Sequence, residues 1–419
     1  MKDQIASYLE TRLPAYLALL RSWVQVNSFT RNAPGVNAVG DLTAAAFEPL
    51  GFSARRVPAS HPEYGQHLVL SRPGQSGHRL GLISHLDTVF SAEEEQSHDF
   101  HWREDGNRIY GPGTNDVKGG TLMIYMVLEA LQHFDPQTFN AVEWKILLNA
   151  AEETLSDDFG ELCRQELQPN GLAALVFEAG KWNDQRFQLV TQRKGMVNYR
   201  IDVQGKAAHA GSSHSAGANA IVQLARLVDQ VAALTDYGQE LTFNAGVIRG
   251  GLVTNRVPHQ ATARGEMRTF ELPVFEQGIQ DLLALQSEVS VTSRDGYPCQ
   301  VNIEITNRTL PWPANPRSEQ LFQLWRQAGT ELGFEIVREA RGGLSDGNHL
   351  WQTLPTIDGL GPHGENSHCS ERSPDGSKDQ EFVARESFLP KALLNIRAIQ
   401  ALCQFPEQFL FIPNNAPSE

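Results

Sequence analysis

The chain has 419 residues, 41% of them hydrophobic, and its 49 Asp and Glu against 35 Lys and Arg give a formal net charge of −14 at pH 7. This length exceeds what one hydrophobic core usually supports, so we expect two domains. The acidic balance argues against nucleic acid and membrane as partners, because both need concentrated Lys and Arg, and leaves small molecules or peptides as ligands.

The chain opens with an amphipathic segment rather than a targeting signal. Between Met1 and Asn27, apolar residues recur at helical spacing among charged ones, unlike the continuous apolar core of a signal peptide. No stretch is long and apolar enough to span a bilayer. The four cysteines lie far apart without CxxC spacing, which argues against a disulfide framework and a cysteine zinc site. We therefore expect a protein of the reducing cytoplasm.

The next segments alternate between strand and helix patterns. The expected helices are 41–50 and 119–134, and the expected strands are 67–71, 79–84, 144–149 and 172–177. A turn-rich stretch at 72–77 separates the first two strands and predicts a hairpin. The alternation predicts an α/β domain in which helices flank a mixed sheet.

The middle of the chain follows a different order. The expected elements are a strand at 196–203, a helix at 219–234, strands at 241–248 and 260–268, a helix at 275–289 and a strand at 301–305. This βαββαβ order is that of a ferredoxin-like α+β sandwich. We therefore expect a compact domain at 193–306, inserted into a larger one formed by residues 1–192 and 307–419.

Four apolar runs end in groups of possible metal ligands. These groups are Ser84-His85-Leu86-Asp87, Thr114-Asn115-Asp116, Ala151-Glu152-Glu153 and Phe177-Glu178. In open α/β sheets the crevice lies beyond the carboxyl ends of the strands, so these side chains should converge. Burying several carboxylates together is costly through repulsion and desolvation, and a divalent cation removes that cost. The pattern therefore predicts a hydrolytic metal centre.

Each group alone admits more than one interpretation. His85 and Asp87 are two residues apart and project to the same side of a strand, where Asp87 can fix the imidazole tautomer that a metal requires. Asp116 precedes a predicted helix, so it is either a bridge between metals or an N-cap. Glu152 and Glu153 point differently, so one can bind metal while the other acts as general base. Solvated surface is the alternative for that pair.

Together these motifs resemble the dizinc M20 metallopeptidases, typified by glutamate carboxypeptidase, acetylornithine deacetylase and succinyl-diaminopimelate desuccinylase. The resemblance rests on His85-Leu86-Asp87-Thr88-Val89, Tyr110-Gly111-Pro112-Gly113, Asp116-Val117-Lys118-Gly119-Gly120, Glu152-Glu153, Glu178 and His368. It implies a zinc-hydrolase catalytic domain with two Zn²⁺ per subunit, or Co²⁺ or Mn²⁺ in their place. It also implies a cis peptide bond between Asp116 and Val117.

The resemblance assigns roles to these residues. It implies five metal ligands, with His85 and Glu178 on one zinc, Glu153 and His368 on the other, and Asp116 as the bridge. Glu152 would be the general base, supported by Asp87 beside His85. His363 is a second candidate for the last ligand, although position favours His368.

The inserted domain resembles that family's lid and dimerisation domain. The loop Gly205-Lys206-Ala207-Ala208-His209-Ala210-Gly211 resembles the one whose histidine, here His209, reaches the partner subunit's site to stabilise the oxyanion. Asn255 and Arg268 would grip a substrate carboxylate, although a salt bridge on the lid surface is the alternative for Arg268. Gly343 lies in a glycine-rich segment, 342–348, that resembles the family's substrate loop.

The resemblance implies an enzyme that cleaves an amide bond next to a free carboxylate. Glu178, rather than Asp, suits the carboxypeptidase and deacylase branches better than the aminopeptidase branch. We expect a carboxypeptidase of the glutamate carboxypeptidase type, acting on small peptides as a homodimer joined through the inserted domain. An N-acyl-amino-acid deacylase is the alternative, a carbamoyl or allantoate-type amidohydrolase is more distant, and an inactive binding homologue belongs to a different functional class.

Overall fold

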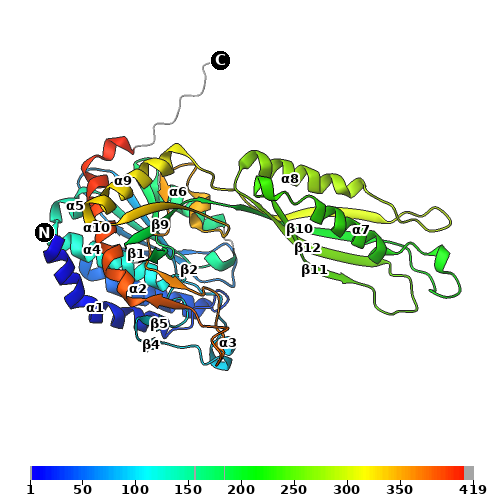
Figure 1. Ribbon diagram of the computed structural model, residues 1–419, viewed down its shortest axis with the longest axis horizontal. Coiled ribbons are helices and arrows are strands. Elements are labelled where there is room, and N and C mark those ends of the chain that lie inside the picture. The colour runs from blue at the N-terminus through cyan, green and yellow to red at the C-terminus, as the bar shows by residue number, and fades with distance from the viewer. Residues whose placement is uncertain (1, 155–156, 184, 410–419) are drawn as a thin grey trace, which may run out of the picture. The chain divides into compact units, whose positions relative to one another are not determined.

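The chain forms two compact units in the structure, a computed structural model that describes residues 2–154, 157–183 and 185–409 (Figure 1). Unit 1 comprises Met1–Thr191, Ala314–Glu339 and Ser345–Glu419, and unit 2 comprises Gln192–Pro313 and Ala340–Leu344. The segment expected as an insertion, 193–306, falls within unit 2. That unit also takes in residues up to Pro313 and the short glycine-containing stretch Ala340–Leu344.

Unit 1 is built on a six-stranded sheet of order β1-β2-β6-β3-β7-β15. The strands are β1 Ser53–Pro58, β2 Gln66–Arg72, β3 Arg79–His85, β6 Glu143–Asn149, β7 Gly171–Val176 and β15 Thr356–Ile357. β6, β3, β7 and β15 run parallel, whereas β2 runs against its neighbours. The parallel strands are almost continuous apolar runs, as expected for strands buried on both faces. The prediction of an α/β fold with a mixed sheet is confirmed.

The predicted hairpin between β2 and β3 is wrong. β6 lies between them, antiparallel to β2 and parallel to β3. The turn-rich stretch after β2 bonds to the chain just before β6, where Gln75 N donates to Asn140 O at 2.9 Å. Glycines and prolines mark where a strand ends but not which strand pairs with it. Here the buried apolar runs β3 and β6 are placed side by side by the crossover through the intervening helix.

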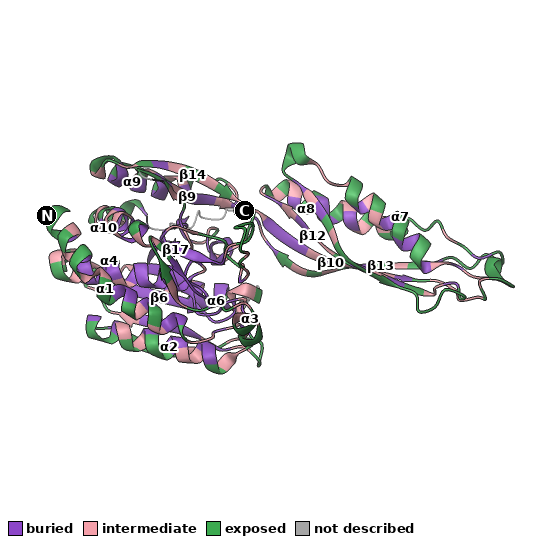
Figure 2. Cartoon of the chain, turned by 60° about the horizontal axis from the view of Figure 1, so that its bottom comes forward, coloured by how far each residue is buried: buried purple, intermediate pink, exposed green. Residues whose placement is uncertain are grey.

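Helices cover both faces of this sheet (Figure 2). Alternate residues of each strand face opposite clusters: Leu82 and Ile146 belong to one, and Ile83 and Leu147 to the other. The first and larger cluster includes residues of α1, α2, α4, α9 and α10, whereas α6 contributes to the second. The helices are α1 Lys2–Val24, α2 Ala33–Phe47, α3 Ala92–Ser97, α4 Lys118–Phe134, α5 Pro136–Ala141, α6 Asp157–Leu167, α9 Pro316–Leu332 and α10 Phe388–Gln404.

Unit 1 contains two smaller sheets, and two strands of the first of them continue into the residues of unit 2. Their orders are β14-β9-β8 and β16-β17-β5-β4. The strands are β4 Arg103–Asp105, β5 Arg108–Tyr110, β8 Trp182–Asn183, β9 Arg186–Arg193, β14 Glu335–Arg341, β16 Gly364–Glu365 and β17 Phe382–Ala384. β17 pairs with β5, which brings the late part of the chain beside the segment that leads to Asp116.

Unit 2 is a ferredoxin-like sandwich. Its antiparallel sheet has the order β11-β12-β10-β13 and packs against α7 and α8. The elements are β10 Gly195–Gln204, α7 Ala220–Ala233, β11 Thr242–Gly250, β12 Gln260–Thr269, α8 Leu272–Ala284 and β13 Gln300–Thr309. Both helices lie on the same side of the sheet in Figure 1. β11 forms one edge, and most of its residues are exposed.

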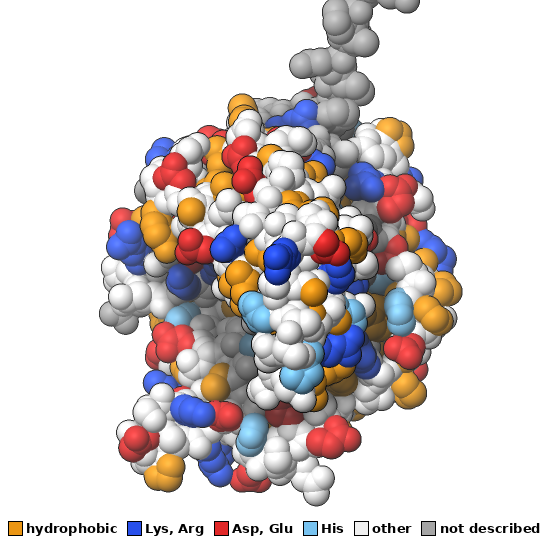
Figure 3. Space-filling view, turned by 90° about the vertical axis from the view of Figure 1, so that its right-hand side faces the viewer, with side chains coloured by type: hydrophobic (Ala, Val, Ile, Leu, Met, Phe, Trp, Pro, Cys, Tyr) orange, Lys and Arg blue, Asp and Glu red, His pale blue; other side chains and the backbone are white. Residues whose placement is uncertain are grey.

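The surface mixes charges of both signs. In Figure 3, Lys and Arg side chains are interspersed with Asp and Glu over the face that is drawn. Within the described ranges, no helix has both the length and the apolar character needed to cross a membrane.

Candidate metal centre

The carboxyl ends of three adjacent parallel strands carry the candidate ligands. β3 ends in His85, β6 is followed by Glu152 and Glu153 in a short 3-10 helix, and β7 is followed by Glu178. Asp116 lies just before α4. Because parallel strands end at the same edge of the sheet, these side chains gather in one place.

Asp116 lies between two imidazoles. His85 Nε2 is 3.1 Å from Asp116 Oδ1, and His368 Nε2 is 3.3 Å from Asp116 Oδ2. His85 Nε2 is also 3.8 Å from Glu178 Oε1, and His368 Nε2 is 3.2 Å from Glu153 Oε2. One carboxylate therefore faces two separate His–Glu pairs. The peptide bond between Asp116 and Val117 is cis, as the sequence resemblance predicted.

The crowding of acids shifts the pKa values of the site. Burial lowers the pKa of His85 by itself, but hydrogen bonds with Asp116 and Asp87 raise it well above its usual value. Hydrogen bonds to Asp116 and Glu153 raise the pKa of His368 to about 11. Burial raises the pKa of Glu153, and it raises that of Glu152 well above the usual range. Without a cation, the histidines are held as imidazolium ions that balance the carboxylates.

The donor set fits a divalent cation. His85, Asp116 and Glu153 each offer a ligand atom, and these atoms lie within 4.8 Å of one another. Glu153 Oε1 is buried and has no hydrogen-bond partner among the described residues, although a buried polar atom normally has one. Imidazole nitrogens and carboxylate oxygens are donors that zinc accepts.

Asp87 connects the ligand-bearing segments. Its Oδ1 accepts from Glu152 N at 3.1 Å, and its Oδ2 accepts from Glu153 N at 3.3 Å and from the Thr30 hydroxyl at 2.7 Å. His85 Nδ1 is 3.0 Å from Asp87 O and 3.3 Å from Asp87 Oδ1. These acceptors keep a proton on Nδ1, so it is Nε2, the nitrogen that faces Asp116, that would lose its proton and offer a lone pair to a metal.

Two buried acids beside the centre, Glu381 and Asp346, were not predicted as site residues from the sequence. Glu381 accepts hydrogen bonds from the backbone of Asn115, Asp116 and His368, and burial, followed by the charge of Asp116, raises its pKa to about 8. Asp346 accepts from Asn149 Nδ2 at 2.9 Å, and burial raises its pKa to about 7. Glu381 directly precedes the apolar residues of β17, but this pattern alone does not indicate a role at the centre.

His363, the second candidate for the last ligand, lies apart from this cluster. Its backbone N donates to Ser387 Oγ at 2.9 Å, and burial lowers the pKa of its ring. It lines a different cavity of about 820 Å³ together with Arg108, Tyr110 and Lys181. Of the two histidines, His368 is the one whose ring meets Asp116 and Glu153.

In unit 2, His209 has a defined tautomer. Its Nδ1 accepts from Gly211 N and Ser212 N, both at 3.1 Å, so the proton of the neutral ring lies on Nε2. The side chain is exposed. Asn255 O accepts from Ala210 N at 2.9 Å, which ties the two loops together.

Arg268 makes the salt bridge that was weighed against a substrate role. Its Nε and Nη2 pair with the two carboxylate oxygens of Glu266 at 2.9 and 3.1 Å, and its Nη1 donates to Gly342 O at 3.0 Å. Gly343 O accepts from Arg193 Nη1 at 2.9 Å. A guanidinium has five N–H groups, so these three bonds leave two N–H groups of Arg268 for a ligand.

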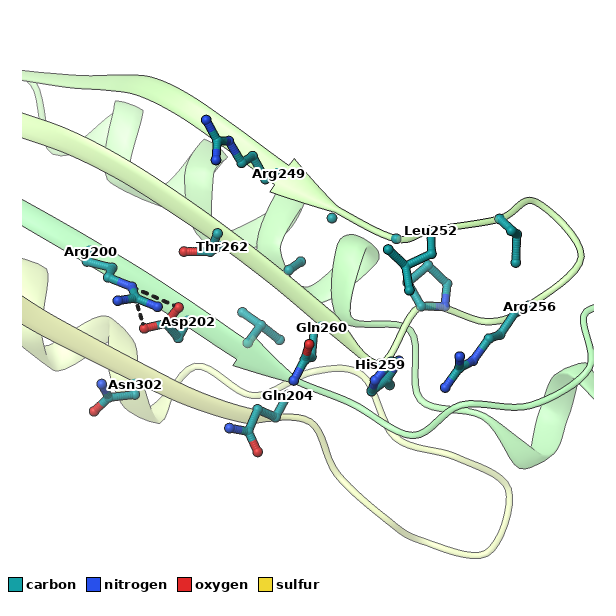
Figure 4. Close-up of a pocket in the computed structure, with 16 residues that line it drawn as sticks. Arg200, Asp202, Gln204, Arg249, Leu252, Arg256, His259, Gln260, Thr262 and Asn302 are labelled. Atoms are coloured by element: carbon teal, nitrogen blue, oxygen red, sulfur yellow. Dashed lines mark hydrogen bonds and ion pairs between the residues drawn. The ribbon is translucent and has the colours of Figure 1, made fainter.

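A second concavity, of about 610 Å³, lies on the sheet of unit 2. Arg200 is paired there with Asp202 at 2.8 Å. Figure 4 shows Arg200 with Asp202 toward one end of this hollow, Arg256 with His259 toward the other, and Arg249 along its side. The charged groups do not converge on one point, so the arrangement lacks the features of a small-molecule site.

The chain is similar in sequence and in fold to known proteins. The model of peptidase family M20/M25/M40 matches residues 81–386. Carboxypeptidase G2 of Pseudomonas sp. (strain RS-16) is 27% identical over 363 residues, covering 85% of this chain and 84% of that protein. Acetylornithine deacetylase of Klebsiella pneumoniae (strain 342) is 25% identical over 338 residues, covering 75% and 82%. The solved structure of a dinuclear metal-binding M20 peptidase from Bacillus subtilis has a TM-score of 0.64 at 11% identity, covering 94% and 99%.

Proposed function

Because this chain belongs to peptidase family M20/M25/M40 and is a hydrolase that acts on amide bonds, we propose that it is a metallo-carboxypeptidase that cleaves next to a free carboxylate. The observation that carries the proposal is the position of Asp116 between His85 and His368. Glu152 and Glu153 are delivered beside them by one segment, so ligands and a general base are available together.

We propose a pair of Zn²⁺ ions, with Co²⁺ or Mn²⁺ as substitutes. His85 and Glu178 would hold one, Glu153 and His368 the other, and Asp116 both. The buried, unpartnered Glu153 Oε1 and the raised pKa values support a cation here. The Bacillus subtilis peptidase of similar fold binds a dinuclear metal centre, which supports a count of two. When bound, the cations supply polarisation of the scissile carbonyl and lower the pKa of the attacking water.

The residues of the chain move the protons. Glu152 takes a proton from the attacking water as the oxygen bonds to the carbonyl carbon. It then gives that proton to the amide nitrogen as the C–N bond breaks, leaving an amine and a carboxylic acid, which loses its own proton to the solvent at neutral pH. Burial raises the pKa of Glu152 well above its usual range, which favours the protonated form that donates to the leaving amine. Asp87 holds the backbone of Glu152 in place, and in the proposed dimer His209 donates from Nε2 to the oxyanion that develops at the site of the other subunit.

Recognition of the substrate's free carboxylate is assigned to Arg268, Asn255 and Gly343. The ion pair with Glu266 holds the Arg268 guanidinium in one orientation while two N–H groups remain for a carboxylate. Glu178 and the similarity to Carboxypeptidase G2 support a carboxypeptidase. An N-acyl-amino-acid deacylase is the second candidate, favoured by the similarity to acetylornithine deacetylase.

A substrate panel tests the function. The zinc-loaded protein is assayed on peptides with a free C-terminus, on the same peptides as C-terminal amides, and on N-acetyl and N-succinyl amino acids. We expect rapid hydrolysis of the free peptides and slow hydrolysis of the amides. Faster hydrolysis of the N-acyl amino acids would show that the protein is a deacylase. Equal rates on the free peptides and their C-terminal amides would contradict the proposed recognition of the free carboxylate. Metal binding without turnover on any substrate would identify an inactive binding homologue.

We also propose a cytoplasmic homodimer joined through unit 2. The exposed edge strand β11 presents Val247 and Ile248 to solvent, and an unpaired edge of this kind pairs readily with a second copy around a twofold axis. The four cysteines are free thiols, which suits a reducing compartment.

A further inference from the structure

Glu381 is a fully buried carboxylate that bonds to backbone rather than to a basic side chain. Its side chain forms no ion pair with Lys or Arg within the described ranges, and its exposure is 0%. Its Oε1 instead accepts from Asn115 N at 3.0 Å and from Asp116 N at 3.3 Å, and its Oε2 accepts from His368 N at 3.4 Å. A buried carboxylate satisfied in this way fixes the position of the peptide groups that donate to it.

These donors belong to two segments that are far apart in the sequence. One segment leads into α4 and carries Asp116, and the other carries His368. The backbone of His368 has φ +67°, a left-handed conformation that non-glycine residues rarely adopt. Such a conformation persists where the surroundings enforce it, and Glu381 supplies a bond to that residue's own N–H.

The backbone of Glu381 is held from two sides: its N–H donates to Cys369 O at 2.8 Å, and its C=O accepts from Gly111 N at 3.4 Å. β17 begins directly after Glu381, and Phe382 pairs with Tyr110 of β5. The intervening loop is also tied to the α3 region: Ser370 Oγ donates to Glu94 Oε1 at 2.6 Å, and Gln380 Nε2 donates to His98 O at 3.0 Å. The β5–β17 pair and the bond to Cys369 together hold Glu381 in place.

We infer that Glu381 is a positioning residue of the metal centre, whose two oxygens set the backbone of Asp116 and of His368 so that both side chains face one cation. This inference rests on the metal centre proposed above. It assigns Glu381 no contact with substrate or with the reacting atoms. A single carboxylate thereby couples the ligand before α4 to the ligand near the end of the chain.

Three variants separate this role from a contribution to stability alone. Glu381→Gln keeps the size but replaces one acceptor oxygen by an N–H donor, so it cannot satisfy all three backbone donors. Glu381→Asp keeps the carboxyl group and withdraws both oxygens by one methylene. Glu129→Gln is the matched control, because Glu129 is another buried glutamate, and it bonds to Arg12, Tyr16 and Tyr125, which lie outside the centre.

Two measurements are made on the full chain. Hydrogen–deuterium exchange of the metal-free proteins follows the segments 114–117 and 366–369, and titration with Co²⁺ alone gives its affinity and visible absorption spectrum. We expect both Glu381 variants to exchange faster in both segments, to bind Co²⁺ roughly 10–100-fold more weakly and to show an altered spectrum. Glu129→Gln should melt at a lower temperature with unchanged Co²⁺ affinity and unchanged exchange in those segments.

The outcomes separate the inference from the metal centre itself. If the wild-type protein binds no Co²⁺, the proposed metal centre itself is wrong, whatever the Glu381 variants do. Two equivalents of Co²⁺ on wild type, with wild-type affinity, spectrum and exchange in Glu381→Gln, would overturn the positioning role alone. If neither Glu381 variant folds while Glu129→Gln does, Glu381 is a folding residue and the inference is likewise overturned.

Discussion

Asp116 gives one carboxylate oxygen to each of two histidines, and those bonds decide their charge before any metal binds. Hydrogen bonds to Asp116 and Glu153 raise the pKa of His368 to about 11, so its ring is protonated at neutral pH. A metal needs the neutral ring, so binding must release that proton. The affinity of the centre for metal should therefore rise with pH throughout the range below 11.

Calorimetric titration of the metal-free protein with Zn²⁺ at pH 6.5 and pH 8, in buffers of different ionisation enthalpy, checks this prediction. The expected result is proton release at both pH values and tighter binding at pH 8. Binding without proton release would contradict the charge state assigned to the histidines.

The general base can be tested by an isosteric change. Glu152→Gln preserves the size of the side chain and the backbone bond to Asp87 but removes the proton acceptor. Hydrolysis should slow by roughly 10²–10⁴-fold while the metal content stays that of the wild type. Steady-state kinetics and metal analysis of the same preparation make the comparison, and near-normal turnover would remove Glu152 from this role.

The two late histidines should behave differently when each is replaced by alanine. His368 meets Asp116 and Glu153, whereas His363 lines another cavity. His368→Ala should lose metal and activity, and His363→Ala should keep both. Elemental analysis of the two purified variants decides between them: full metal content in His368→Ala would show that the ligand has been misassigned.

At the scale of elements, much of the architecture was readable from the sequence because burial leaves a pattern. β3, β6 and β7 are apolar runs that end in ligand types, so their shared edge followed from sheet geometry. The order of elements in unit 2 likewise matches the predicted βαββαβ pattern. The strand that pairs with β2 could not be predicted from the sequence, because the pairing depends on the crossover connection and not on the turn that follows β2.

Glu381 escaped prediction for a related reason. Its significance comes from three backbone N–H groups that the fold brings to it, and a backbone donor leaves no trace in the sequence. The loop between His368 and Glu381 also separates residues that are neighbours in space. Arg268 illustrates the opposite case, since the sequence suggested either a substrate contact or a salt bridge for it, and the structure contains the salt bridge with Glu266.

The exposed edge strand β11 is where we expect two copies of the chain to pair. Ile248 is 57% exposed on β11, and a lysine there places charge in any strand-to-strand interface. Ile248→Lys should therefore convert the proposed dimer to monomers. Tyr237→Lys is the matched control, because Tyr237 is 81% exposed in unit 2 but lies outside β11. Sedimentation velocity measures both, and a dimeric Ile248→Lys would exclude β11 from the interface.

At the scale of the whole molecule, the proposed dimer shares residues between subunits. If His209 serves the partner's site, a hybrid of Glu152→Gln and His209→Ala subunits has one site with both residues and one with neither. Random mixing makes half the dimers hybrid with one intact site in two, so about a quarter of wild-type activity should return. The assay is turnover after subunit exchange, with exchange followed by native mass spectrometry. Exchange without recovered activity would place His209 in its own subunit's site.

The division of unit 1 into separated stretches of chain has a consequence for its biosynthesis. Residues 1–191 form most of the sheet, but α10, which packs against α1 and α4, is made from residues near the end of the chain. At ribosomal speeds of roughly 5–20 residues per second, the segment from Ala314 to the end of α10 takes on the order of 5–20 s to emerge. Throughout that interval the apolar sides of α1 and α4 await their cover, while unit 2 already has almost its whole sequence. The nascent chain therefore exposes an apolar surface during that interval, and we expect a ribosome-associated chaperone to bind it.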